Sequence, residues 1–219
     1  MNLAILIDGT SAVVVLGGTA LATVLRCGFT DCGLAMAKLV RLGRSNFDAE
    51  ATRAELAAQI QQIRRDGLYR TQPRHLGDSE FDEATDALIS SRSLAALLER
   101  HEAHRKRRLH ANDRAVRTFA QGAELAPVFG LAGTLISLSQ LPADGLARGA
   151  FMGAIAMAVT TTLYGLLLAN LVLAPIARMI ERAAQAEEAQ RQAVIDWLAA
   201  QVADEVPRSR AAPAGRAAA

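Results

Sequence analysis

Two threonines stand on ladders of small residues, and their hydroxyl oxygens are the groups in this sequence best suited to handling an ion. The first ladder, at intervals of four residues, consists of Ala126, Gly130 and Thr134. The second has the same spacing, interrupted only by Met157, and consists of Gly149, Gly153, Thr161, Gly165 and Ala169. Such a narrow helical face either packs closely against another helix or frames a polar path. Hydroxyl oxygens are hard ligands that suit a partly dehydrated Na⁺.

The most basic stretch, HEAHRKRRLH at residues 101–110, carries two histidines with a different spacing from a zinc motif. His101 and His104 are three residues apart, whereas HExxH requires four, so no metal site is predicted. We interpret the stretch as a solvated basic face near a membrane, with anionic lipid headgroups as its expected contact. Because no aromatic side chains are interleaved for base stacking, nucleic acid binding is not expected.

The remaining polar residues form no catalytic constellation. Cys27 and Cys32 have four residues between them and no nearby histidine, so we expect ordinary packing. The sequence has no phosphate-binding glycine loop and no nucleophile elbow. It therefore predicts neither an enzyme nor a cofactor.

A length of 219 residues would suit one or two soluble domains. Three long runs without charged side chains instead predict membrane-crossing helices, and the two ladders lie within two of these runs. Residues 149–177 contain no Asp, Glu, Lys, Arg or His. As a helix they would reach roughly 43 Å, beyond the ~30 Å hydrocarbon core of a bilayer. Residues 125–143 form a second uncharged run, and residues 9–25 form a third, which lengthens only by enclosing Asp8.

We therefore predict an all-α membrane protein with three transmembrane helices and a helical cytoplasmic segment between the first and second. The predicted boundaries are a first span within residues 1–25, a cytoplasmic segment at 26–117, a second span at 118–142, an external loop at 143–148, a third span at 149–177, and a cytoplasmic amphipathic helix and tail at 178–219.

The distribution of cations predicts the orientation. Of the 24 Lys and Arg residues, 17 lie between Arg26 and Arg117 and six lie from Arg178 onward, which leaves only Arg148 between the second and third spans. Cationic loops stay in the cytoplasm, so the N-terminus is predicted outside and the C-terminus inside. Because the first cation follows the apolar stretch, the first segment is predicted to be a retained span and not a cleaved signal peptide.

Apolar periodicity predicts several helices outside the spans. Between Cys32 and Gly67 we expect amphipathic helices, two if the chain breaks near Gly43–Phe47. A turn at residues 71–78 and a helix from Phe81 to Leu97 are expected next.

Two expectations concern the ends of the later spans. Pro127 is expected near the start of the second span, where its missing N–H is tolerated. An amphipathic helix is expected at residues 183–206, followed by a tail with the composition of a disordered segment.

The uncharged blocks resemble a known family. APVFGLAGTLISL at residues 126–138 and GAIAMAVTTTLYGLLLANLVLAPIA at 153–177 resemble the paired channel helices of the MotA/TolQ/ExbB ion-channel family, above all those of the flagellar stator subunit MotA. DGTSAVVVLGGTALATVL at 8–25 is similar to the second membrane helix of that subunit, and IRRDGLY at 63–69 to a cytoplasmic motif of the family.

The resemblance implies a homo-oligomer, a pentamer, around two copies of a single-span partner of the MotB, ExbD or TolR type in a bacterial inner membrane. The partner's membrane aspartate would carry the ion, in agreement with the lack of an intramembrane carboxylate here. It also implies channel-helix prolines at Pro127 and Pro175, and hydroxyls beside the ion path at Thr134, Thr161 and Thr162. Thr161 and Thr162 point about 100° apart on a helix, so both cannot line one narrow path. We assign Gly130, Gly133, Gly153 and Gly165 to helix packing.

Two departures from the MotA pattern leave the driven process open. The first of that subunit's four spans has no counterpart here, a layout closer to ExbB and TolQ. Arg64 occupies a position implied to contact a flagellar rotor protein, but Gln72 stands where the family has a glutamate. The hypotheses are a MotA-like stator subunit driven by H⁺ or Na⁺, an ExbB/TolQ-like energiser of an envelope process, and a membrane scaffold without an ion path.

Overall fold

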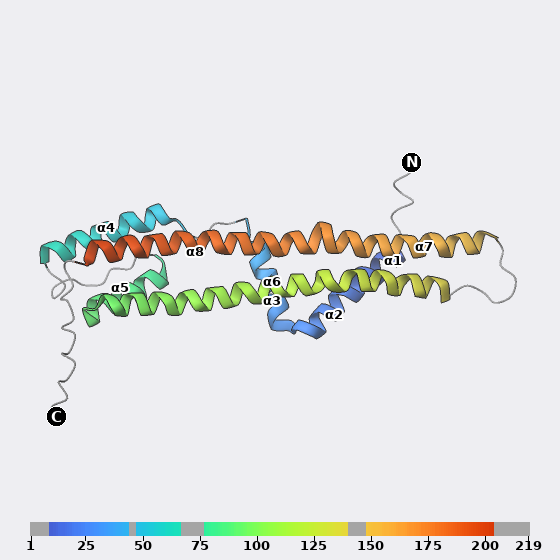
Figure 1. Ribbon diagram of the computed structural model, residues 1–219, viewed down its shortest axis with the longest axis horizontal. Coiled ribbons are helices and arrows are strands. Elements are labelled where there is room, and N and C mark those ends of the chain that lie inside the picture. Colours follow the sequence, from blue (N-terminus) through green and yellow to red (C-terminus); the bar gives the residue numbers. More distant parts are fainter. Residues whose placement is uncertain (1–8, 44–46, 67–76, 140–147, 204–219) are drawn as a thin grey trace, which may run out of the picture. The chain divides into compact units, whose positions relative to one another are not determined.

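The computed structural model describes residues 9–43, 47–66, 77–139 and 148–203, and every regular element among them is helical (Figure 1). In chain order the elements are α1 (Gly9–Ala12), the π-helical η2 (Val13–Gly17), α2 (Gly18–Cys27), α3 (Phe29–Arg41), α4 (Ala49–Asp66), α5 (Ser79–Ser91), α6 (Leu94–Ser139), α7 (Arg148–Leu167), the π-helical η3 (Leu168–Leu173) and α8 (Ala174–Val202). Three of the helical stretches are long and apolar enough to cross a membrane. The predicted all-α fold with three membrane helices is confirmed. Asp8, Gln72 and the C-terminal tail lie outside the described residues.

The chain forms two compact units. The membrane unit comprises residues 1–44 and 110–184 and holds the apolar parts of all three spans. The polar unit comprises residues 45–109 and 185–219. Helices α6 and α8 each contribute residues to both units, so each unit is built from segments far apart in the sequence.

The first span is a helix that ends at a glycine. Small and β-branched residues form α1, η2 and α2, where the backbone satisfies its own hydrogen bonds as lipid requires. Gly28 then takes φ +85°, which L side chains rarely adopt, while its N–H still bonds to the carbonyl of Val24 at 2.8 Å. The chain thereby turns directly into α3. The expected pair of amphipathic helices before Gly67 is confirmed as α3 and α4.

Helix α6 corrects two expectations. The single helix expected from Phe81 to Leu97 is wrong, because Arg92 takes a left-handed conformation with φ 53° and separates α5 from α6. Serines around this point offer the backbone alternative hydrogen bonds, as when Ser91 Oγ donates to the carbonyl of Ala87. Pro127 does not lie near a helix start, because α6 already begins at Leu94. Between Leu94 and Gln121 the sequence contains no glycine or proline that would interrupt the helix.

The third span and the following amphipathic segment are one helical run. The amphipathic helix expected at residues 183–206 is the later part of α8, which begins at Ala174 and ends at Val202. Pro175 is the second residue of α8, and η3 ends two residues before it. A proline ring clashes with the carbonyl four residues earlier, and the wider π-helical turn relieves that clash without ending the helix.

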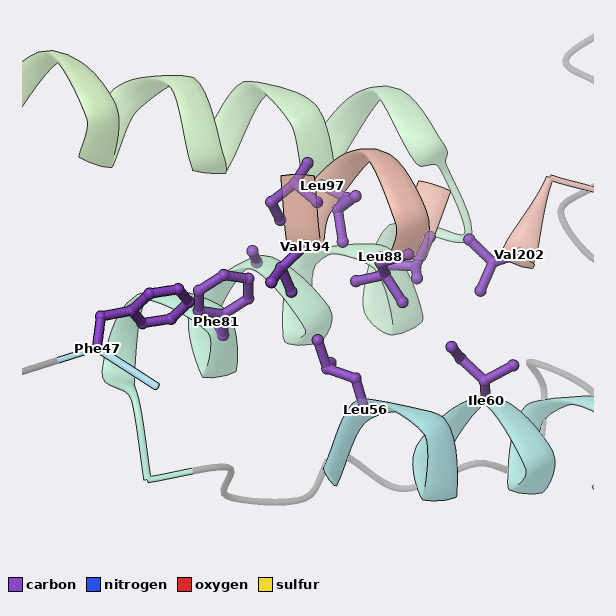
Figure 2. Packing of buried hydrophobic residues seen from close by; sticks show 11 residues of the cluster. Phe47, Leu56, Ile60, Phe81, Leu88, Leu97, Val194 and Val202 are labelled. Atoms are coloured by element: carbon purple, nitrogen blue, oxygen red, sulfur yellow. The ribbon is translucent and has the colours of Figure 1, made fainter. Parts of the chain in front are cut away.

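Each unit has its own buried cluster. In the polar unit, Phe47 stacks on Phe81 with ring centroids 5.6 Å apart, and Figure 2 shows aliphatic side chains from α4, α5, α6 and α8 packed beside them. In the membrane unit, Ala35 of α3 packs with Phe119 of α6 and Ile180 of α8. These clusters position the helices that carry the candidate site.

Candidate ion-pathway helices

The second and third spans meet along a seam of small residues in the membrane unit. The seam residues, all buried, are Ala126, Gly130, Gly133 and Ser137 on α6, and Thr161, Gly165 and Ala169 on the third span. A Cβ added to Gly165 would lie 2.6 Å from the carbonyl oxygen of Ala126. A Cβ added to Gly130 would lie 3.0 Å from the carbonyl oxygen of Thr161. Since only hydrogen fits at these points, the two backbones are in direct contact.

Gly133 and Thr161 form the next contact along the seam. A Cβ on Gly133 would lie 2.8 Å from Cβ of Thr161. The Thr161 side chain therefore occupies the space that Gly133 leaves, and Thr161 is 0% exposed. Gly153, by contrast, has nothing within 4 Å of an added Cβ, so its assigned packing role stays a prediction about neighbours outside this chain.

The first span packs on the same pair of helices. The ring of Phe129 on α6 lies against Gly18, where a Cβ would collide with it. Ser11 and Val15 are each 0% exposed, and α1 and η2 contact α7. Small residues on the first span thus allow a third helix to approach closely.

The three candidate threonines donate their hydroxyl hydrogens to carbonyls of their own helices. Thr134 donates to Leu131 at 2.6 Å, and Thr162 donates to Ala158 at 3.3 Å. Thr161 is within reach of Met157 and Ala158, at 3.1 and 2.9 Å. Such back-bonding satisfies the donor and leaves oxygen lone pairs, which can still coordinate a cation at an accessible position.

Accessibility separates the three threonines. Thr134 and Thr162 are partly exposed, whereas the Thr161 oxygen is sealed within the seam. Within this chain Thr134 and Thr162 can face a path beside the seam, and Thr161 cannot. In this chain the Thr161 side chain packs against Gly133.

Both prolines lie at or near the seam. Pro127 is inside α6, and its Cα would be 3.2 Å from a Cβ added to Gly165. Proline donates no hydrogen bond, so it leaves the carbonyl of residue 123 without its helical partner. Pro175 follows η3, so the second and third spans each contain a stretch of irregular backbone hydrogen bonding.

The parts of the two spans that form the seam carry no acidic, basic or histidine side chain that could exchange a proton. Neither uncharged run, residues 125–143 or residues 149–177, contains an acid, a histidine or a basic side chain. A chain of water molecules and a titrating carboxylate are what proton transfer through a membrane needs. These helices offer closely packed walls and hydroxyl oxygens, and a carboxylate must come from another chain if ions move here.

The basic stretch at residues 101–110 corrects another expectation, because much of it is not solvated. His101 and His104 are 6% and 7% exposed, and they face α8 and α5 within the polar unit. His104 Nε2 lies 3.0 Å from a carboxylate oxygen of Glu83. Arg108 binds both oxygens of Glu188 and also contacts Glu80. Only side chains such as Lys106, which is 73% exposed, remain available to lipid headgroups.

Arg64, the candidate rotor residue, is exposed but already forms a hydrogen bond within the chain. Arg64, in the last turn of α4, is exposed, and its Nη2 donates to Oε1 of Gln201 at 2.9 Å.

Two polar contacts of the membrane unit were missed by sequence reasoning. The Cys27 thiol donates to Oε1 of Gln121 at 2.9 Å, which agrees with a packing role for that cysteine. Arg114 Nε donates to Oδ1 of Asp31 at 2.9 Å across 83 residues of sequence, and this hydrogen bond lowers the pKa of Asp31. No periodicity or motif pairs residues so far apart, so only the tertiary structure reveals them.

Comparison with known proteins agrees with this architecture. The profile of the MotA/TolQ/ExbB proton channel family matches residues 61–193, which is more than half of the chain. The protein YtxD of Bacillus subtilis is 35% identical over 130 residues, covering 59% of this chain and 43% of YtxD. Motility protein A of Cereibacter sphaeroides is 28% identical over 198 residues, covering 88% of this chain and 76% of that protein.

The fold is shared with a solved structure. The flagellar MotAB stator complex from Bacillus subtilis contains a chain that is 17% identical, with a TM-score of 0.77, and the likeness covers 92% of this chain and 81% of that one.

Proposed function

The chain belongs to the MotA/TolQ/ExbB proton channel family, and on that premise we propose that it is a subunit of an ion-driven complex that converts ion flow across the inner membrane into mechanical work. The observation that carries the proposal is the seam between α6 and α7. It is built by Gly130 and Gly165 at backbone contact, it has partly exposed hydroxyls at its side, and it lacks any ionisable side chain. A close-packed wall of this kind suits a rotor or channel lining around a titrating group that another chain supplies.

The proposal includes two kinds of partner. The second chain is a single-span subunit of the MotB, ExbD or TolR type with a membrane aspartate, and several copies of the present chain, five by the resemblance, surround it. Large apolar side chains on the membrane unit support this, since Leu131, Leu135 and Val159 are 57%, 69% and 65% exposed in a single chain. Lipid and neighbouring subunits would cover them. The distribution of arginines along the sequence supports a cytoplasmic C-terminus.

The driven process that we propose is flagellar motility, because a relative is named Motility protein A and the shared fold is that of a flagellar stator. Arg64 is the candidate rotor contact. An energiser of another envelope process is favoured by the two departures from the MotA pattern, among them Gln72 in place of the family's glutamate. The neighbouring subunit distinguishes the two, because a peptidoglycan-binding partner belongs to a stator.

The experiment has two arms. First, the tagged chain is purified from its native membrane in mild detergent, and the proteins that accompany it are identified; we expect a single-span protein with a membrane aspartate. Second, ion flux is measured in liposomes that contain this chain alone, the complex, or the complex with that aspartate changed to asparagine. We expect flux from the intact complex only. Equal flux from the chain alone would refute the proposal, and an oligomer that never conducts with any partner would indicate a scaffold.

A further inference from the structure

Helix α4 packs on the polar unit with a face that is only partly apolar. Leu56 and Ile60 are 0% and 4% exposed, and Figure 2 shows both pointing into the buried cluster. Gln59 lies on the same face, because residues three and four apart are neighbours on a helix surface. The packed face of α4 therefore carries a polar amide beside its two aliphatic side chains.

The amide of Gln59 is buried without a hydrogen-bond partner. Gln59 is 2% exposed, and neither its Nε2 nor its Oε1 makes a hydrogen bond within the described part of the chain. On the same helix, Oε1 of Gln62 and Nε of Arg53 are also buried there without a partner. A buried polar group that loses its hydrogen bonds to water and gains none in the protein opposes folding, so these atoms destabilise the packed position of α4.

Few contacts offset this loss. Among the described residues, the side chains of α4 form hydrogen bonds to another helix only through Arg64, which donates to Gln201 of α8. Because this pair is in contact with solvent, water competes for the same groups and the net stabilisation is modest. The first turns of α4 are also incompletely packed, since a groove of about 510 Å³ is lined by both Arg53 and Gln190 of α8.

Ion pairs join the other three helices of the polar unit. Arg108 of α6 binds both oxygens of Glu188 on α8 and also contacts Glu80 on α5. Arg191 of α8 forms an ion pair with Asp78, the N-cap of α5, at 2.8 Å. Separating these helices would leave largely buried guanidinium groups without a partner, so α5, α6 and α8 hold together more strongly than they hold α4.

We propose that α4 is a releasable helix, which detaches from the polar unit as one piece while α5, α6 and α8 stay together. In the released state the amide of Gln59 regains hydrogen bonds to water, at the cost of exposing Leu56 and Ile60. The packed state is favoured by a small margin, because the two effects oppose each other. Local opening of this kind requires less free energy than global unfolding.

Release changes the surroundings of the candidate rotor residue. Arg64 lies in the last turn of α4, and its guanidinium is beside Gln201 only while α4 is packed. A partner that binds Arg64 better in one of the two states shifts the equilibrium toward that state. This consequence rests on the proposed function. The equilibrium itself belongs to the polar unit, and it can be measured without ion flow or a rotor.

The test is hydrogen–deuterium exchange of the full chain, purified as its oligomer in mild detergent, with detection by mass spectrometry. After correction for intrinsic rates, the central amides of α4, around Leu56 and Ile60, should exchange about tenfold faster or more than those of α5 around Leu88. Release as one piece opens the centre of α4, whereas fraying opens only its end turns. Equal protection of α4 and α5, or fast exchange confined to the ends of α4, would overturn the proposal.

A substitution of Gln59 tests the cause of release. Gln59→Met keeps an unbranched side chain of similar size and removes the polar amide. We expect exchange across α4 to slow about tenfold, the factor that corresponds to one unpaired buried group, while exchange in α5 is unchanged. Gln61→Met makes the same change at an exposed position of α4 and should leave the rates as they are. An unaltered rate in Gln59→Met would contradict the proposal.

A second pair of variants tests the remaining polar contact. Arg64→Ala removes the hydrogen bonds to Gln201 and should speed exchange across α4 about threefold, with α5 unaffected. Arg65→Ala removes the same charge from the neighbouring exposed position and should have no effect. This pair decides the matter if size-exclusion chromatography shows that Gln59→Met does not fold. Equal rates in the two arginine variants, or acceleration of α4 and α5 together, would show that α4 is not released separately.

Discussion

Gly130 of α6 and Gly165 of α7 face each other across the seam, where a Cβ added to Gly165 would lie 3.1 Å from the Cα of Gly130. The contact is between backbones, so each glycine determines how closely the two spans approach. Membrane helices gain association energy from such close packing, since lipid offers no hydrophobic drive to bring them together.

The first prediction compares two glycines of the same ladder. Gly165→Ala places a methyl group 2.6 Å from the carbonyl oxygen of Ala126, and overpacking of this kind typically costs about 1–3 kcal/mol. We expect a lower unfolding temperature for the detergent-solubilised oligomer, measured by loss of its size-exclusion peak after heating. Gly149→Ala is the matched control, because its methyl group meets no atom of the described chain within 4 Å and no packing role is assigned to it. Larger residues should act more strongly, and Gly130→Leu should prevent assembly. Equal stability of the two alanine variants would show that the seam is not tight.

The second prediction concerns the transported ion. We expect a sodium dependence that rests on Thr134, because its oxygen is partly exposed whereas that of Thr161 is buried. Flux through the complex is measured with and without Na⁺ at fixed membrane potential, in the wild type and in Thr134→Ala. Loss of flux in sodium-free medium and a severalfold loss in Thr134→Ala are the expected results. Full activity without Na⁺ would identify a proton-driven protein, and Thr161→Val, which retains the packing shape, should conduct normally in either case.

The third prediction is a pH dependence of stability in the polar unit. Burial lowers the pKa of His101, while Gln192, Glu188 and Glu102 raise it and Arg105 lowers it further. A histidine with a lowered folded-state pKa binds its proton more readily when unfolded. The stability it contributes is therefore present above the ordinary value of 6.5 and declines as the pH falls below 6.5.

The measurement is the thermal unfolding of the solubilised protein between about pH 5 and pH 8, where histidine is the side chain that ordinarily titrates. We expect His101→Gln to reduce the decline in unfolding temperature on the acidic side. His110→Gln, at an exposed position, serves as the control and should reproduce the wild-type profile. An unchanged profile in His101→Gln would contradict the prediction.

The fourth prediction concerns Arg191, which joins the core of the polar unit to its acidic groups. Its guanidinium lies 4.3 Å from the ring centroid of Phe47 and forms ion pairs with Asp78 and Glu187 at 2.8 and 2.9 Å. Removing one partner of a fully buried ion pair costs about 3–5 kcal/mol. Because the Asp78 and Glu187 side chains are 20% and 40% exposed and so partly solvated, we expect a smaller loss from these ion pairs, to which the loss of the guanidinium packed over Phe47 is added. We expect Arg191→Ala to be strongly destabilised in chemical denaturation.

Arg107→Ala provides the comparison, since it removes the same charge from an exposed position. It should change the free energy of unfolding by less than about 0.5 kcal/mol. Similar effects of the two substitutions would mean that net charge, and not the buried contact, stabilises the polar unit.

The helical membrane fold could be predicted from sequence because its cause is local. A run such as residues 149–177 excludes charge along its whole length, and lipid requires its backbone to form a helix whatever surrounds it. The family resemblance rests on the same runs. The break between α3 and α4 was likewise foreseeable from the residues around Gly43.

Other features depended on contacts between distant segments. Pro127 was expected near a helix start because the uncharged run begins there, yet α6 starts at Leu94, since helix formation does not end where the membrane ends. The histidines at 101 and 104 were expected to be solvated, but α5 and α8 cover them. Charge predicts solvent exposure only when no packed surface supplies partners.

The seam shows most clearly which features could be predicted from the sequence and which depend on the tertiary structure. Four-residue spacing indicated small faces on both spans, but spacing describes one helix at a time. Gly133 lies beside the first ladder and touches Thr161. Gly153 lies on the second ladder, yet a Cβ added there would meet no atom of the described chain within 4 Å. Composition thus determined which residues are small enough for close packing, and the relative placement of α6 and α7 decided which of them touch, because a contact is a property of two surfaces.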